Sequence, residues 1–225
     1  MASTVRSPPS SSPIARLVIA AGLAAFLGLH VTAAVLYRGG TFCDAAAPRY
    51  QIWGNYVCDL TQPRTPAGAD NRPAAELATW AFAAIAFAFL PFWWRVGAWL
   101  PAGARRLVRI AGPVSAVGTF VVARLPSARW PWFHVSAVFA ATIPGLVAAG
   151  ISVVGLLRAR RWSLGVPGAA TLIFAAADAV GYARAVTAGS RCNPALPVLQ
   201  KLAALALVIW MMAIALAHSA SRRAR

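Results

Sequence analysis

Long apolar segments alternate with short polar ones along the whole chain. Three of the apolar segments contain no Asp, Glu, Lys or Arg, namely 17–37, 77–94 and 130–157. A helix needs about 20 mainly apolar residues to cross the hydrocarbon core of a bilayer. Each of these three segments therefore predicts a membrane-spanning helix.

Three further apolar segments are interrupted by charged residues. One becomes long enough if Arg109 extends its side chain to the interface, one contains Asp178, and the last contains Lys201 near its start. We therefore expect an all-α integral membrane protein with six spans, at about 15–37, 76–99, 106–124, 130–157, 162–186 and 196–218.

The segments between the spans indicate how the helices are connected. Only the loop 38–75 is long, and its prolines and glycines favour ordered turns or a lid over a helix. The other loops are short, which predicts an antiparallel bundle of sequential neighbours. The membrane domain would cover 14–218, between a Ser/Pro-rich disordered tail at 1–13 and a basic tail at 219–225.

Composition agrees with a membrane protein. The chain is 60% hydrophobic and 12% charged, whereas a soluble domain carries about 25% charged residues. The net charge of +16 raises the question of nucleic-acid binding. The arginines, however, stand at the ends of the apolar segments, as membrane topology signals do. We expect membrane lipid as a partner and no nucleic acid.

Arginine and lysine positions also predict the orientation. With the N-terminus inside, twelve of them lie on the cytoplasmic side and nine outside, so both termini are expected in the cytoplasm. The loop 38–75 is then external, and four of the five acidic residues fall between positions 44 and 76. The Ala- and Arg-rich composition is typical of GC-rich coding and favours the plasma (inner) membrane of a bacterium.

The three cysteines, Cys43, Cys58 and Cys192, all lie in predicted external loops. An oxidising exterior would give one disulfide and one free thiol. All three pairings stay open, as do three free thiols. The sequence contains no C-x-x-C spacing, which would indicate metal ligation by cysteine.

Polar residues inside the spans are the candidates for a functional site. At about 1.5 Å per residue, His30, His134 and Asp178 lie about 10, 6 and 12 Å below the outer ends of their helices. Intramembrane ionisable groups usually face a bundle interior, and Asn55 and Asp59 lie in the loop above. These five residues form one candidate site.

Two readings of the five residues differ in what they imply. Two histidines and two carboxylates would suffice to hold zinc and a reactive water. In the structural reading, Asp178 pairs with Lys201 or Arg184, and each histidine bonds a carbonyl oxygen. The sequence leaves both readings open, and the metal content stays unknown.

Short motifs carry a family resemblance. Asn55-Tyr56-Val57-Cys58-Asp59-Leu60, then Asn71-Arg72-Pro73 before the second span, and His134 at the start of the fourth resemble the bacterial domain-of-unknown-function 998 family. The plan is similar to the damage-regulated autophagy modulators. The resemblance implies six spans, cytosolic termini and a use for Asp59 and His134. It indicates no particular activity and gives no support to a disulfide.

Three functions follow as hypotheses. The first is a non-enzymatic membrane protein without a cofactor, which binds a lipid or a partner protein in its outer half under the external loop. The alternative is a ceramidase-like, zinc-dependent hydrolase of lipid amides or esters at the outer leaflet. A transporter comes third, because it would need polar groups through the full depth of the bundle.

Overall fold

The computed structural model describes residues 12–190 and 192–217, and six long helices dominate them. Their bounds are α1 Pro13–Leu36, α2 Arg72–Ala98, α3 Ala102–Arg124, α4 Pro131–Arg158, α5 Trp162–Thr187 and α6 Ala195–Leu216. All six are long and apolar enough to cross a membrane. The chain is therefore an all-α, multi-pass integral membrane protein, as its apolar segments predict. The predicted tail 219–225 and nearly all of the tail 1–13 lie outside the described residues.

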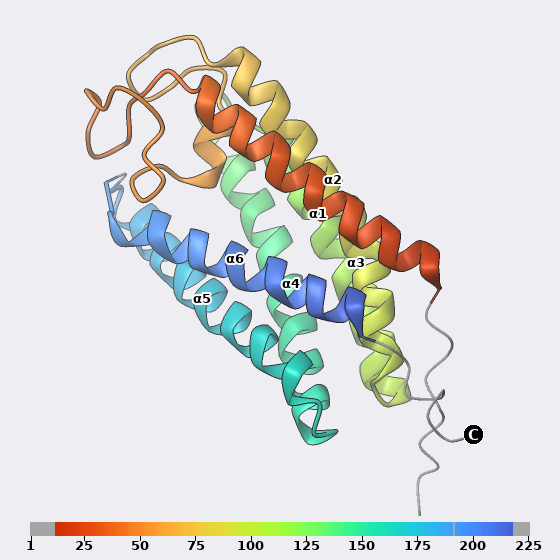
Figure 1. The fold of residues 1–225 in the computed structure, drawn as a ribbon. Helices are drawn as coiled ribbons and strands as arrows, with labels where there is room; N and C mark the ends of the chain where they lie inside the picture. Colours follow the sequence, from red (N-terminus) through yellow and green to blue (C-terminus); the bar gives the residue numbers. More distant parts are fainter. Residues whose placement is uncertain (1–11, 191, 218–225) are drawn as a thin grey trace, which may run out of the picture.

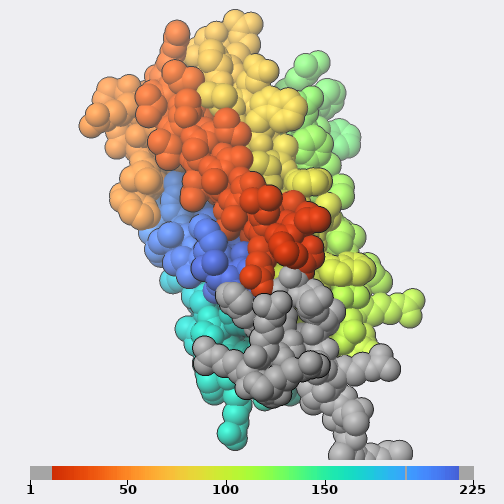
Figure 2. Space-filling view, turned by 45° about the vertical axis from the view of Figure 1, so that its right-hand side comes forward, coloured from red at the N-terminus to blue at the C-terminus, as the bar shows by residue number. Residues whose placement is uncertain are grey.

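The helices form an antiparallel ring in sequence order. Each packs against the next, and contacts between α1 and α6 close the ring (Figure 1). Figure 2 shows α1 lying along the surface between α2 and α6. Large apolar side chains are exposed on all six helices, among them Val31, Trp80, Val117, Ile143, Ile173 and Leu205. This surface suits lipid chains.

Local sequence sets the helix starts. Proline occupies the first turn of α1, α2 and α4, where its missing N–H has no intrahelical partner to lose. Helices α2 and α3 each begin four residues before the predicted spans, at Arg72 and Ala102. The polar flank of each span thus continues as helix beyond the apolar segment.

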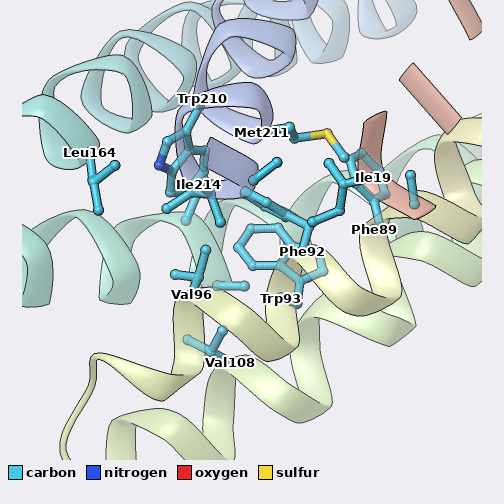
Figure 3. Close-up of a cluster of buried hydrophobic side chains, with 14 of the residues drawn as sticks. Ile19, Phe89, Phe92, Trp93, Val96, Val108, Leu164, Trp210, Met211 and Ile214 are labelled. Atoms are coloured by element: carbon cyan, nitrogen blue, oxygen red, sulfur yellow. The ribbon is translucent and has the colours of Figure 1, made fainter. Parts of the chain in front are cut away.

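The main core lies in the half of the bundle away from the α1–α2 loop (Figure 3). Trp210 of α6 is fully buried and meets Phe92 and Trp93 of α2 edge-on, with ring centroids 5.0 and 5.9 Å apart. Gly112 of α3 makes room for this cluster, because a Cβ there would lie 2.2 Å from Trp93 Cγ. Aromatic rings thus fill the loop-distal half.

Candidate functional site

The α1–α2 loop folds into an ordered cap, residues 37–71, over one end of the ring. Its short 3₁₀ helix η1, Val57–Thr61, contacts α1, α2, α3 and α6 and therefore lies over the middle of the bundle. The Asp59 carboxylate accepts a hydrogen bond from the backbone N–H of Tyr56 at 2.9 Å. This contact fixes the start of η1 and points Asp59 inward.

Asn55 is the centre of the cap and is fully buried. Its side-chain nitrogen lies within hydrogen-bond distance of three acceptors: Tyr37 Oη at 3.2 Å, Gly40 O at 2.8 Å and Asp59 Oδ2 at 3.0 Å. Its side-chain oxygen accepts from the Gln51 N–H at 2.8 Å. One amide thus joins the end of α1 to η1.

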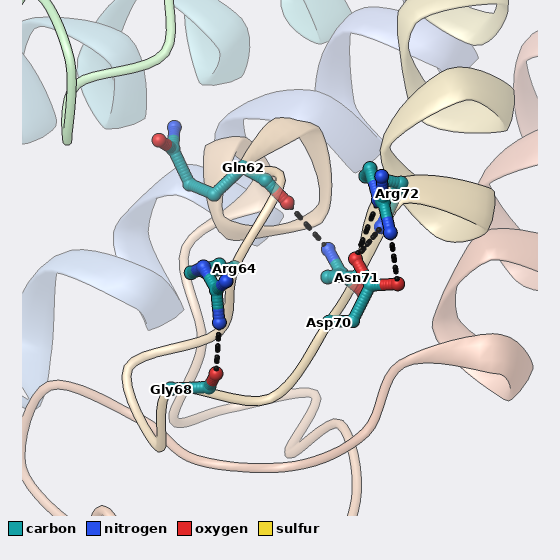
Figure 4. A network of polar contacts seen from close by, with 6 residues as sticks. All are labelled: Gln62, Arg64, Gly68, Asp70, Asn71 and Arg72. Atoms are coloured by element: carbon teal, nitrogen blue, oxygen red, sulfur yellow. Dashed lines mark hydrogen bonds and ion pairs between the residues drawn. The ribbon is translucent and has the colours of Figure 1, made fainter.

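A second buried amide, Asn71, closes the far side of the cap. Its side chain donates to the carbonyl oxygens of Leu60 and Gln62 at 3.3 and 2.8 Å, and Figure 4 shows the bond to Gln62. Asp70 and Arg72 beside it form an exposed ion pair, which contributes little to stability. The buried amides, rather than this ion pair, hold the cap together.

Contacts from the start of α6 tie the cap to the bundle. Lys201 Nζ donates to the backbone oxygen of Asn55, and Gln200 Oε1 accepts from the Val57 N–H at 2.6 Å. A disulfide joins Cys43 of the cap to Cys192, just before α6, across a sequence separation of 149. Of the three pairings that the sequence left open, the structure has this one.

Cys58 is the remaining, free cysteine. It packs against an apolar cluster of Val122, Ala137 and Ala141 at the adjoining ends of α3 and α4. Burial, followed by the negative charges of Asp59 and Asp178, raises the pKa of the Cys58 thiol to about 12. The thiol is therefore unreactive at neutral pH.

Lys201 is within electrostatic reach of three of the candidate residues. It interacts electrostatically with His30 of α1, Asp59 of η1 and Asp178 of α5. Its ammonium also lies 5.5 Å from the ring centroid of Tyr50. We call His30, Asn55, Asp59, Asp178 and Lys201 the loop-side cluster. Three helices and the cap contribute to it.

Asp59 is a weaker acid than an ordinary aspartate side chain. Burial raises its pKa to about 6, although hydrogen bonds from Asn55 and Tyr56 and the charge of Lys201 act in the opposite direction. Burial and the nearby Asp59 charge also raise the pKa of Tyr50. The cluster therefore contains a carboxyl group that exchanges a proton just below neutral pH.

Two acceptors in the cluster have no hydrogen bond. The His30 Nδ1 lies 3.2 Å from the Phe26 carbonyl oxygen and so carries the proton, which leaves Nε2 as an acceptor, and Nε2 is buried without a partner. Asp178 is half-buried. Within the described part of the chain, it forms neither a hydrogen bond nor a direct ion pair with Lys201 or Arg184.

Within the described residues, no contact joins His134 to the other candidates. It is 4% exposed, and its Nδ1 donates to the Leu125 carbonyl oxygen at 2.6 Å across the α3–α4 turn. Sequence reasoning had no information on the direction of its side chain. It also missed Tyr37 and Gln200, because it considered only ionisable side chains within the spans, and neither tyrosine nor glutamine is charged at neutral pH.

The arrangement bears on metal binding as well. Residues 12–190 and 192–217 contain no group of three or more His, Cys, Asp or Glu side chains that could hold a metal ion. A zinc-dependent hydrolase therefore finds no ligand set in the described residues.

No family model, no curated protein and no solved structure matches the chain. The six spans that the resemblance to the domain-of-unknown-function 998 family implies are present, but no match confirms membership. Function must therefore be argued from the site.

Proposed function

We propose that this multi-pass membrane protein is not an enzyme and binds the headgroup of a membrane lipid in its loop-side cluster. The Asp178 carboxylate carries the proposal. It lies nine residues before the end of α5, at a depth of about 13 Å, and has no hydrogen bond within the described residues. A carboxylate at such depth is costly unless partners compensate it. Lys201 acts on Asp178 only through its charge, and a ligand would supply the missing hydrogen bonds.

The free groups of the cluster indicate the chemistry of the ligand. Asp178 and His30 Nε2 both accept hydrogen bonds, so they favour a ligand that donates them, through an ammonium or a hydroxyl group. Lys201 donates to Asn55 O and, as an ammonium, has further donors. These donors would meet a phosphate. A phospholipid headgroup with a donating end supplies both.

The opposite half of the bundle favours binding over transport. A transport path needs polar groups through the whole depth, whereas Phe92, Trp93 and Trp210 fill the loop-distal core. The cap closes the other end with buried hydrogen bonds. A ligand would enter the cluster from the side, between helices, as a lipid can.

We further propose that the capped end faces the exterior of a bacterial plasma membrane. The Cys43–Cys192 disulfide supports this orientation, because disulfides persist in oxidising compartments. The excess of arginine at the other end supports it too. A fluorescent protein that needs the cytoplasm to mature, fused after Arg225, should fluoresce. A dark, fully expressed fusion would refute the orientation.

Asp178→Asn tests the ligand, with Asp70→Asn as the matched control. Asp70 undergoes the same chemical change at an exposed site in the cap. Lipids retained after purification in detergent are quantified by mass spectrometry. We expect the wild type and Asp70→Asn to retain one phospholipid class near stoichiometry, and folded Asp178→Asn to lose it. Equal retention in all three proteins would refute the proposal.

A further inference from the structure

The loop-distal end of the bundle carries positive charge without any carboxylate. All five acidic side chains of the sequence lie elsewhere: Asp44, Asp59, Asp70 and Glu76 in the cap or the start of α2, and Asp178 in the half of α5 next to the cap. Arginines occupy the opposite end, including Arg105 and Arg109 in the first turns of α3. Within the described residues, neither Arg105 nor Arg109 forms an ion pair with a carboxylate.

Arg109 is held in place but is not neutralised. Its guanidinium lies over the ring of Trp94 on α2, 3.7 Å from the centroid. Its Nε is buried without a partner, and within the described residues the side chain forms no hydrogen bond. Arg105, one turn earlier, uses one nitrogen to donate to Leu100 O at 3.1 Å. Both guanidinium groups thus keep free donors.

An apolar groove begins one turn beyond Arg109. Its volume is about 430 Å³, and its lining includes Pro113, Val117 and Val121 of α3 and Ala137 of α4. Arg109, Pro113 and Val117 follow at four-residue steps and form one row along the helix. The row turns by about 40° per step, from the α2 side at Arg109, which packs on Trp94, toward the groove beside α4. At about 1.5 Å per residue, the groove starts about 6 Å from Arg109.

We propose that this side of α3 binds an anionic phospholipid. Arg105 and Arg109 contact its phosphate, because a guanidinium presents paired donors that fit phosphate oxygens, and one acyl chain lies in the groove. Half of the ~30 Å hydrocarbon core is about one acyl-chain length, enough to run from Arg109 past Val117. The exposed Trp94, Leu107 and Ile110 beside the arginines favour a lipid over a soluble phosphate.

Native mass spectrometry of the detergent-purified protein tests this site with phosphatidylglycerol and phosphatidylcholine of identical chains. Each basic side chain near an anionic lipid contributes about fivefold in affinity. Arg105→Gln/Arg109→Gln should therefore lower phosphatidylglycerol binding more than tenfold. The control Arg158→Gln/Arg160→Gln removes two exposed arginines at the same end and should leave binding within about threefold of the wild type.

Two further measurements distinguish the contribution of the lipid headgroup from that of the acyl chain. Val117→Trp fills the groove at a side chain that is 62% exposed, so the fold tolerates it, and phosphatidylglycerol binding should fall several-fold. Inorganic phosphate at millimolar concentration should not displace the lipid. Equal binding of phosphatidylcholine, equal loss in both arginine variants, displacement by phosphate, or an unaffected Val117→Trp variant would each overturn the proposal.

Discussion

Removal of the Asn55 side chain should open the cap. Asn55→Ala deletes the amide that joins Tyr37, Gly40 and Asp59 and leaves the Gln51 N–H without its acceptor. The site is fully buried, so the abandoned groups regain no water while the cap stays closed. The Asp59 carboxyl group is affected most, because the hydrogen bond from Asn55 counteracts the effect of burial on its pKa. Without that bond the pKa rises further, and the buried group must either bind a proton or carry its charge with one donor fewer.

The size of the effect follows from these contacts. A neutral hydrogen bond contributes about 1 kcal/mol and one to a charged group about 1.5–3 kcal/mol. Water that enters at the end of the bundle will offset part of the loss, so we expect a destabilisation of about 3–5 kcal/mol. For a chain of this length, each kcal/mol corresponds to roughly 2–4 °C in the melting temperature, which predicts a decrease of at least about 6 °C.

Cys58 provides the assay, because it is the only free cysteine of the chain and packs beneath the cap. A dye that fluoresces on reaction with thiols reports its exposure during heating in detergent. The control is Asn193→Ala, which removes one exposed hydrogen bond to Ala195 N and should shift the transition by less than about 3 °C. Equal shifts in the two variants would refute the assignment of Asn55 as the centre of the cap.

A double-mutant cycle with Asp59→Ala checks the reasoning further. In the double variant no buried carboxylate is left without its donor. The double variant should therefore be more stable than the sum of the single effects implies, by about 1–3 kcal/mol. Additive effects would show that Asn55 and Asp59 act independently, against the 3.0 Å contact between them.

Three other changes probe the cap and the core. Burial raises the pKa of Asp59 from 3.8 to about 6, so the folded state binds the proton more tightly, and stability falls as the pH rises from 4 through 6; Asp59→Asn should flatten a plot of melting temperature against pH, and an unchanged slope would exclude Asp59 as its cause. Gly112→Ala places a Cβ 2.2 Å from Trp93 Cγ and should cost about 1–3 kcal/mol in thermal unfolding, whereas Gly103→Ala, with open space around it, should cost nothing. Cys43→Ser/Cys192→Ser should destabilise the cap by about 2–4 kcal/mol and speed the labelling of Cys58, and unchanged labelling would mean that the disulfide does not hold the cap closed.

Sequence reasoning succeeded for properties that depend only on position along the chain. The length of an apolar segment decides whether a helix can cross a bilayer, and all six predicted spans correspond to helices of sufficient length. Depth along a helix follows from the rise per residue, so the sequence placed His30 and Asp178 in the halves of α1 and α5 that are next to the cap. Only the flanks of α2 and α3 escaped this reasoning, because helix there extends into polar sequence.

The rotation of each helix about its axis and the pairing of residues that are distant in the sequence could not be predicted, for a physical reason. The direction of a side chain depends on how its helix is rotated against the neighbouring helices in lipid. No charged or apolar stripe in the sequence specifies that rotation for the helix of His134. The same holds for the cysteines. Cys43 and Cys192 meet only because the ring closes between α1 and α6, a tertiary contact that sequence spacing does not contain. The apolar groove between α3 and α4 was missed likewise, because its walls come from two helices.

The single lysine shows how the two ends of the bundle differ. The other cationic side chains are arginines, and at the loop-distal end Arg109 and Arg161 lie over the rings of Trp94 and Trp99, on which a planar guanidinium stacks well. Lys201 instead reaches the Asn55 carbonyl under the cap, beside the Tyr50 ring and between two carboxylates. A compact ammonium fits there, whereas a broader guanidinium would press against the buried Asn55 contacts. The contact between the cap and α6 thus depends on one small cation.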